Sequence, residues 1–282
     1  MKLTMTAKAK INLTLKVLGR RENGYHDIQS IMQLLEFGDE VSVEWQNTPG
    51  IRVTCSQKDL PTDENNIAYR AAELMQKTYG ISGGFQIHLE KKIPVAAGLA
   101  GGSTNAAAVM HLINRLCKLQ LSFSELASLG LTLGADVPFC LYGKPALAEG
   151  IGEILSPASG LLDCYVVLAN PGIGVSTGAI YKAIDEASVA PKTDTKKLLA
   201  ALAQGDLAEA FLHMENMMEP VAESFCPEIR EILSAIKKTG ADHVMMSGSG
   251  ATCFGIYLKK PDEQMLKKIL GNSFVALTTP VQ

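Results

Sequence analysis

The sequence predicts an α+β protein built from two domains. Its 282 residues exceed the usual size of a single hydrophobic core, and domains of about 100 to 150 residues are the common solution. Runs with the two-residue period of strands and runs with helical period occur in both halves of the chain. Between the halves lies the small, turn-rich stretch SPASG at 156–160. We therefore expect an N-terminal domain over 1–158 and a C-terminal domain over 159–282.

Composition favours an ordinary soluble protein that acts on a small molecule. With 47% hydrophobic residues, 20% charged residues and a net charge of −3, the chain is neither disordered nor basic enough to bind nucleic acid. The six cysteines show no metal-ligand spacing, so we expect reduced thiols. Lysines interrupt the N-terminal apolar run and no run of about 18 apolar residues occurs, so we expect a cytoplasmic protein without a signal peptide or membrane span.

The first half alternates strands and helices. At 10–17, Ile11 and the apolar residues that follow at every second position alternate with polar ones, which predicts a strand with one face buried and Lys10 and Asn12 pointing off that face. Further strands are predicted at 40–45, 51–56 and 85–93. Helical spacing runs over 65–80 and stops at Gly80, and an alanine-rich helix is predicted to start near residue 103. A capping box in SFSE, at 122–125, marks a third helix start.

The second half has its own order of elements. Strands are predicted at 164–170, 243–247, 252–258 and 274–280, several helices between 176 and 240, and another helix at 261–270. This order approximates β-α-β-β-α-β, the split ferredoxin-like motif, with extra helices inserted in the first crossover.

The stretch PVAAGLAGGSTNAAA, at 94–108, is the first candidate for a functional site. Its glycine spacing fits neither the P-loop, because Ser103 stands where a lysine is required, nor the dinucleotide fingerprint. A glycine turn that feeds a helix can still bind an anion, because the first N–H groups of the helix have no intrahelical partner and carry the positive end of the macrodipole. The simpler interpretation is a strand-to-helix turn in which glycine only allows close packing.

Two further segments resemble functional sites. In LGLTLGADVPFCLYG, at 129–143, Asp136 follows a helix amid apolar neighbours, either as a helix N-cap or as a carboxylate that accepts a substrate hydroxyl's proton. In MMSGSGATCFGIYL, at 245–258, Gly248 and Gly250 separate two strand-like runs. That turn is either a plain hairpin or a second glycine loop that faces the first one.

These three segments, in this order after AKAKINLTLKVLGRRENGYHDIQSIMQ at 7–33, resemble the superfamily of small-metabolite kinases named after galactokinase, homoserine kinase, mevalonate kinase and phosphomevalonate kinase. The resemblance covers the whole chain. It implies the two-domain fold of these GHMP kinases, with an N-terminal mixed α/β domain, a ferredoxin-like C-terminal domain and the active site in the cleft between them. It also implies ATP and Mg²⁺ as cofactors.

Within the superfamily, the segments around NGYHD and LGADVPFCLYG are most similar to the branch that phosphorylates the 2-hydroxyl of a cytidine diphosphate-linked methylerythritol, in the non-mevalonate isoprenoid route. The resemblance implies Asp136 as the general base and Lys10 as the cation that favours negative charge on the carboxylate and on the developing alkoxide. The implied substrate-binding residues are Asn12, Tyr25, His26, Thr177 and Tyr181. Tyr25 would stack on the cytosine, His26 would hydrogen-bond its edge and Tyr181 would cover its second face.

The resemblance assigns ATP binding to the whole first glycine loop, namely Pro94, Val95, Ala96, Ala97, Gly98, Leu99, Ala100, Gly101, Gly102, Ser103 and Thr104. The superfamily loop often reads GLGGGSSNAA, so Ala100 and Thr104 replace a glycine and a serine. We expect an ordinary backbone conformation at Ala100 and a retained hydroxyl at Thr104.

Three functions stay open at this point: the cytidyl-substrate kinase, a kinase of another alcohol such as homoserine or mevalonate, and a nucleotide-binding regulator without turnover. The NGYHD segment, whose implied role is to bind cytosine, favours the cytidyl-substrate kinase over a kinase of another alcohol. The presence of both Lys10 and Asp136 argues against a regulator without turnover. We expect a monomer or weak homodimer, and no cluster of carboxylates identifies the metal ligands.

Overall fold

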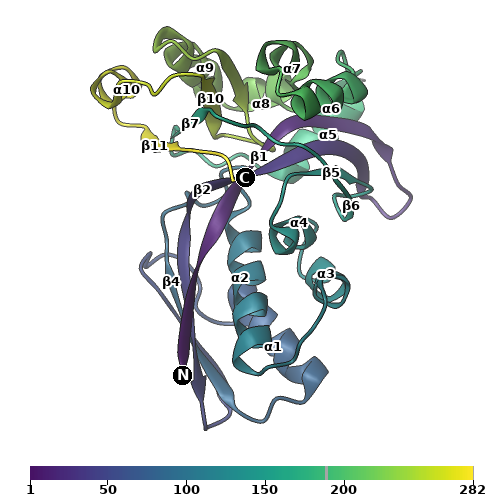
Figure 1. The fold of residues 1–282 in the computed structure, drawn as a ribbon, viewed down its shortest axis with the longest axis vertical. Helices are drawn as coiled ribbons and strands as arrows, with labels where there is room; N and C mark the ends of the chain where they lie inside the picture. The colour runs from purple at the N-terminus through teal and green to yellow at the C-terminus, as the bar shows by residue number, and fades with distance from the viewer. Residues whose placement is uncertain (188–189, 282) are drawn as a thin grey trace. The chain divides into compact units, whose positions relative to one another are not determined.

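The computed structural model describes residues 1–187 and 190–281, which form two compact units (Figure 1). Unit 1 consists of Met1–Ala9, Gly38–Ile93 and Ala100–Gly143, and unit 2 of Lys10–Phe37, Pro94–Leu99 and Lys144–Gln282. Each unit is therefore assembled from separate stretches of the chain. The predicted division at residue 158 is a single cut of the chain, whereas these units alternate along the sequence. That division therefore stays a prediction.

Two long strands contribute to both units. They are β1 (Lys2–Arg20) and β2 (His26–Gln46), and the division between the units falls inside each of them. The strand order of this sheet is β3-β4-β2-β1-β8, with β5 paired to β2 and β6 paired to β5. The remaining bounds are Gly50–Cys55 for β3, Gly84–Glu90 for β4, Ala146–Glu149 for β5, Ile154–Pro157 for β6 and Glu215–Asn216 for β8.

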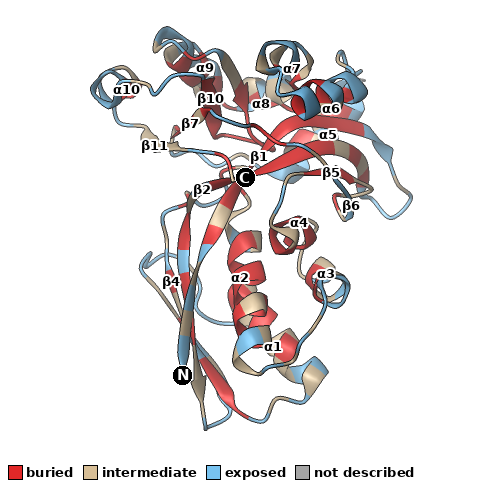
Figure 2. Ribbon diagram, viewed as in Figure 1, coloured by how far each residue is buried: buried red, intermediate tan, exposed pale blue. Residues whose placement is uncertain are grey.

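In unit 1, four helices pack with the sheet formed by β3, β4 and part of β2. They are α1 (Ile67–Tyr79), α2 (Gly101–Leu116), α3 (Phe123–Leu131) and α4 (Val137–Tyr142). Helix α1 ends at Gly80 in the left-handed conformation, and the capping box of Ser122 and Glu125 starts α3, as predicted. Helix α2 is buried along most of its length (Figure 2), which explains its alanine-rich sequence.

Unit 2 contains an antiparallel sheet with the order β11-β7-β10-β9. In chain order its strands are β7 (Tyr165–Asn170), β9 (His243–Met246), β10 (Cys253–Tyr257) and β11 (Phe274–Thr278). The fourth strand therefore lies beside the first, and the third lies between the first and the second. That arrangement, together with helices α9 (Glu228–Lys238) and α10 (Glu263–Leu270) in the two crossovers, confirms the ferredoxin-like motif.

The helices predicted inside the first crossover are also present. They are α5 (Thr177–Ala187), α6 (Thr195–Gln204), α7 (Leu207–His213) and α8 (Glu219–Phe225), and strand β8 lies between α7 and α8. Helix α9 contacts β7, β9 and β10 and buries Ile229, Ile232 and Ile236. The apolar stripe of an amphipathic helix thus forms part of the core of unit 2.

The prediction that β1 has only one buried face is wrong. Its polar residues are buried together with its apolar ones, with exposed fractions of 5% for Lys10, 1% for Asn12, 0% for Thr14 and 5% for Lys16. The Lys10, Asn12 and Lys16 side chains tolerate this burial because they find hydrogen-bond partners: Lys16 Nζ, for example, donates to the carbonyl of Thr193. The Thr14 hydroxyl has no partner among the described residues. The alternation of polar and apolar residues therefore does not indicate a solvated face in this strand.

Candidate active site

The first glycine loop contacts the second one within unit 2. Ser247 Oγ donates to the carbonyl of Gly98 at 3.0 Å, and Thr252 N donates to the carbonyl of Ala97 at 3.3 Å. A Cβ on Gly98 would lie 2.2 Å from the carbonyl oxygen of Ser247, so only glycine allows this approach. Of the two alternatives for the second glycine-rich segment, the one in which it faces the first loop is therefore present.

The backbone of the loop is left-handed at every second residue of its central part. The φ angles are 51° at Ala96, 75° at Gly98 and 56° at Ala100. Turns of this kind direct successive N–H groups into a common concavity that suits an anion. The expectation of an ordinary conformation at Ala100 is wrong, because Ala100 occupies the N-cap position of α2 and takes the left-handed conformation there.

The start of α2 carries no side-chain cap. Helices α1, α3, α6 and α10 each have a side chain that accepts from a first-turn N–H, whereas the N-cap of α2 is Ala100. Its first N–H groups therefore lack both an intrahelical and a side-chain partner, and they carry the positive end of the helix dipole. Ser103 is half-buried and Thr104 is 4% exposed, so two hydroxyls accompany these amides.

A buried polar network in unit 1 joins the residues on either side of the loop. Asp39 Oδ1 accepts from the backbone N–H groups of Lys92 at 2.7 Å and Ile93 at 2.8 Å, just before the loop begins. Asp39 Oδ2 accepts from Asn105 Nδ2 at 2.8 Å, one residue after the loop, and pairs with Lys91 Nζ. Lys91 Nζ also donates to Asn105 Oδ1 at 2.9 Å. Sequence reasoning missed this network, because Asp39 and Glu40 are adjacent acids and only the structure shows that Asp39 is the buried one.

Lys10 lies beside the loop in unit 2. Its backbone N–H donates to the carbonyl of Leu99 at 3.1 Å. Its Nζ donates to Asn12 Oδ1 at 2.7 Å, and Asn12 Nδ2 donates to Ser30 Oγ at 2.7 Å. Ser30 Oγ in turn donates to the carbonyl of Thr14 at 2.6 Å. This chain of hydrogen bonds fixes the orientation of the amine and the amide that the sequence singled out.

Asp136 occupies the N-cap position of α4 in unit 1, and its side chain makes no capping hydrogen bond. The side chain is half-buried. A Cβ on Gly134, two residues earlier, would lie 3.9 Å from Ser103 Oγ, so the segment that carries Asp136 lies beside the start of α2. The carboxylate is therefore not used as a helix cap. Because Asp136 belongs to unit 1 and Lys10 to unit 2, their pairing stays a prediction.

The hairpin turn between β1 and β2 presents Tyr25 and His26. Tyr25 is 57% exposed, whereas His26 is only 9% exposed. The imidazole of His26 stacks on the ring of Tyr181, with ring centroids 4.5 Å apart and 16° between the planes. Arg21 closes the turn through hydrogen bonds to Asp27, and these bonds lower the pKa of the Asp27 carboxyl.

Two residues that the sequence did not single out contact predicted substrate-binding residues of unit 2. Asp185 Oδ1 lies 2.7 Å from His26 Nε2, which anchors the imidazole. Ser249 Oγ lies 2.8 Å from Thr177 Oγ1, which connects the start of α5 to the second glycine loop. Asp185 is four residues after Tyr181 on a predicted helix, and that spacing is the signal that would have found it.

A metal centre made of protein side chains is not present among the described residues, where no group of three or more His, Cys, Asp or Glu side chains gathers. The six cysteines form no disulfide, and burial raises the pKa of Cys164 to about 12. In residues 1–187 and 190–281, no helix is long and apolar enough to cross a bilayer.

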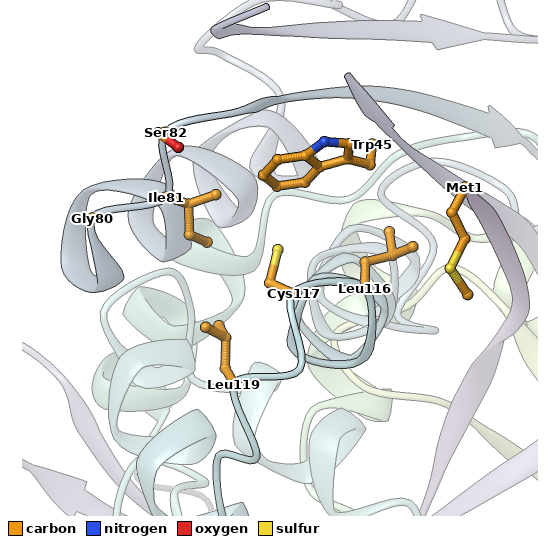
Figure 3. Close-up of a pocket in the computed structure, with 8 residues that line it drawn as sticks. All are labelled: Met1, Trp45, Gly80, Ile81, Ser82, Leu116, Cys117 and Leu119. Carbon is orange, nitrogen blue, oxygen red and sulfur yellow. The ribbon is translucent and has the colours of Figure 1, made fainter. Parts of the chain in front are cut away.

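A surface pocket of about 410 Å³ in unit 1 involves none of these residues (Figure 3). It is lined by Met1, Trp45, Gly80, Ile81, Ser82, Leu116, Cys117 and Leu119. No charged side chain lines it, and burial raises the pKa of the Cys117 thiol, which lowers its reactivity.

Comparison with known proteins places the chain in a class. Residues 66–144 match the model of the GHMP kinases N terminal domain, and residues 198–275 match that of the GHMP kinases C terminal. Fold and glycine loops together thus define a two-domain α+β small-molecule kinase of the GHMP class, which uses ATP.

Individual relatives narrow this class. The chain is 45% identical over 253 residues to a 4-diphosphocytidyl-2-C-methyl-D-erythritol kinase of Alkaliphilus metalliredigens, covering 90% of this chain and 87% of the relative. It is 43% identical over 260 residues to that of Shouchella clausii, covering 92% and 87%. A crystal structure of 4-(cytidine 5'-diphospho)-2C-methyl-D-erythritol kinase superposes with a TM-score of 0.82 at 34% identity, covering 98% of this chain and 99% of that one. The chain belongs to the 4-diphosphocytidyl-2-C-methyl-D-erythritol kinase family.

Proposed function

We propose that the protein transfers the γ-phosphoryl group of ATP to the 2-hydroxyl of 4-diphosphocytidyl-2-C-methyl-D-erythritol, giving the 2-phosphate and ADP. Family membership over nine-tenths of the chain supports this reaction. The observation that carries the site assignment is the 3.1 Å hydrogen bond from Lys10 N to the carbonyl of Leu99, because it places the proposed catalytic strand beside the glycine loop.

ATP binds along the loop from Pro94 to Thr104 in this proposal. The left-handed residues of the loop and the uncapped start of α2 offer backbone N–H groups that the phosphates can share, so no lysine is required within the loop. The hydroxyls of Ser103 and Thr104 supply further hydrogen bonds.

Mg²⁺ fits this donor set as a partner of the nucleotide. Magnesium keeps several waters and is usually held by one or two carboxylates plus the phosphates of its substrate. The nearby oxygen ligands are the hydroxyls of Ser103 and Thr104 at the start of α2 and the carboxylate of Asp136, which makes no capping hydrogen bond. When bound, the ion would neutralise charge on the phosphates.

Asp136 acts as the general base, and Lys10 as the cation at the reacting oxygen. The carboxylate accepts the proton of the 2-hydroxyl, the oxygen forms its bond to the γ-phosphorus, and the bond to ADP breaks. The Lys10 ammonium stabilises the charge that develops on that oxygen. The proposal requires both side chains to reach the same hydroxyl in the substrate complex.

The substrate lies between residues of β1, the 21–27 turn and α5. Asn12 is held by Lys10 and Ser30 and contacts the methylerythritol part. Exposed Tyr25 stacks on the cytosine, and His26 hydrogen-bonds its edge. Thr177 contacts the ligand from the start of α5, and Tyr181 covers the second face of the base.

An ADP-release assay with the purified protein tests this function. Turnover is measured with the cytidyl substrate, with the same methylerythritol phosphate lacking the cytidine, and with homoserine and mevalonate. We expect turnover on the cytidyl substrate to exceed that on every other alcohol. Preference for an alcohol without cytidine would contradict the substrate assignment. ATP binding without turnover on any alcohol would instead support a nucleotide-binding regulator. A monomer or weak homodimer in the cytoplasm stays our expectation for its state in the cell.

A further inference from the structure

Two side chains of α5 hold the same imidazole in unit 2. Tyr181 stacks on His26 at 4.5 Å, and Asp185, one helical turn later, has Oδ1 2.7 Å from His26 Nε2. Residues at i and i+4 lie on one face of a helix, so a single helix supplies both contacts. The stack fixes the plane of the imidazole, and the hydrogen bond fixes its rotation within that plane. Together they hold His26 in one orientation in the free protein, and Asp185 keeps its contact when Tyr181 covers the base.

The contact with Asp185 also determines which ring nitrogen carries the proton. An ionised carboxylate only accepts hydrogen bonds, so Nε2 of His26 must be the donor in this pair. In the neutral imidazole the other nitrogen, Nδ1, then has a lone pair and no proton. In that neutral form, the contact with Asp185 makes Nδ1 a hydrogen-bond acceptor.

We propose that Asp185 is a positioning residue that sets the preference for cytosine over uracil through His26. This inference rests on the proposed function, in which His26 contacts the edge of the base. Cytosine carries an exocyclic amine that donates to Nδ1, whereas uracil carries a carbonyl oxygen at the same place. Two acceptors facing each other repel, and a desolvated group without a partner is costly.

The preference is measured as the ratio of kcat/KM for the cytidyl substrate to that for its uridine counterpart. We expect Asp185→Asn to lower this ratio at least about tenfold, the size of one oriented hydrogen bond. The amide of asparagine can donate or accept, so the imidazole is free to adopt either tautomer. The change should appear mainly in KM, because Asp185 does not contact the reacting hydroxyl.

Two further variants separate positioning from stability. Asp185→Glu keeps an acceptor on the helix and is expected to retain the cytidine preference. Glu186→Gln removes a neighbouring exposed carboxylate on the same helix and is expected to leave the ratio unchanged. Circular dichroism confirms that all variants are folded, which we expect because the Asp185 side chain is partly exposed, at 31%.

Nitrogen NMR of His26 gives a readout that does not depend on activity. In the free wild-type protein we expect the shifts of a neutral imidazole protonated on Nε2, and in Asp185→Asn a mixture of tautomers. A wild-type imidazole protonated on Nδ1, or an unchanged ratio in Asp185→Asn, would overturn the role of Asp185. Absence of turnover on the cytidyl substrate by the wild-type enzyme would instead overturn the proposed function, so the two failures are distinguishable.

Discussion

Asp39 of β2 and Asn105 of α2 are joined by a hydrogen bond of 2.8 Å, with Asn105 Nδ2 as donor and Asp39 Oδ2 as acceptor. The same carboxylate accepts from the backbone N–H groups of Lys92 and Ile93 and pairs with Lys91. One fully buried side chain thus connects the residues that enter the phosphate loop with those that leave it. We therefore expect this side chain to affect both the stability of the fold and the proposed binding of ATP.

Asp39→Asn is therefore expected to affect both properties. The substitution leaves the buried ammonium of Lys91 without a carboxylate, and breaking a buried pair costs about 3 to 5 kcal/mol. We expect the free energy of unfolding in urea to fall by about this amount and KM for ATP to rise more than kcat falls. Glu73→Gln, which removes an exposed pair with Lys77, is the matched control and should cost no more than about 0.5 kcal/mol. Equal stability of the two variants would contradict the role of the network.

Asp136→Asn tests the general base. Asparagine keeps the size of the side chain but cannot accept the hydroxyl proton, so kcat should fall by about 10² to 10⁴. ATP affinity, measured by calorimetry, should stay within about threefold, because the loop amides are untouched. Asp163→Asn, at an exposed left-handed position, serves as the control for loss of a carboxylate. Full activity of Asp136→Asn would remove Asp136 from the catalytic machinery.

Gly98→Ala tests the contact between the two glycine loops. Both Gly98 and Gly24 have left-handed φ, at 75° and 86°, but only Gly98 has backbone atoms where a Cβ would lie. Gly24→Ala should therefore cost only the strain of a left-handed alanine, about 1 kcal/mol. Gly98→Ala should lose more stability and raise KM for ATP at least about tenfold, since the carbonyl of Ser247 must move. Similar ATP kinetics in the two variants would show that the loops tolerate separation.

His243 gives a pH dependence of stability. Burial lowers its pKa from 6.5 to about 4, with nearby Lys237 adding to the shift. Between these values the unfolded chain binds a proton that the folded protein does not, so stability falls as pH is lowered from about 6.5 to 4. The loss attributable to this residue is on the order of 3 kcal/mol when complete.

Urea unfolding at pH 7 and pH 5 measures this effect. His243→Gln should show a smaller loss of stability between the two pH values than the wild-type protein, whatever its absolute stability. The imidazole stacks on Phe211 and its Nε2 has no hydrogen-bond partner among the described residues, so protonation there is not compensated. If both proteins lost the same stability between pH 7 and pH 5, other titratable groups would be responsible for the pH dependence.

The local features of the fold could be predicted from the sequence. Short-range patterns predict the stop of α1 at Gly80 and the capping box at Ser122. Chain order predicts the ferredoxin-like motif. All three are confirmed. Lys10 and Asn12 were found as a pair for the same reason, because alternation along a strand places them on one side.

The remaining features depend on partners that are distant in sequence. His26 and Asp185 are 159 residues apart, and Asp39 and Asn105 are 66 apart, so no local period connects them. The burial of Lys16 follows from an acceptor at Thr193, which the strand pattern does not reveal. The left-handed Ala100 is set by the helix start that it precedes, since its own residue type disfavours that conformation.

The interleaving of the two units has a consequence for biosynthesis. The chain passes from one unit to the other five times, and the last passage is at Gly143 and Lys144. Every residue of unit 1 has therefore been synthesised by residue 143. Lys10, His26 and the 94–99 segment leave the ribosome early but must wait for α5 and the second glycine loop. A chain that ends at Gly143 would contain every residue of unit 1 but would lack Asp185 and the proposed substrate-binding residues Thr177 and Tyr181.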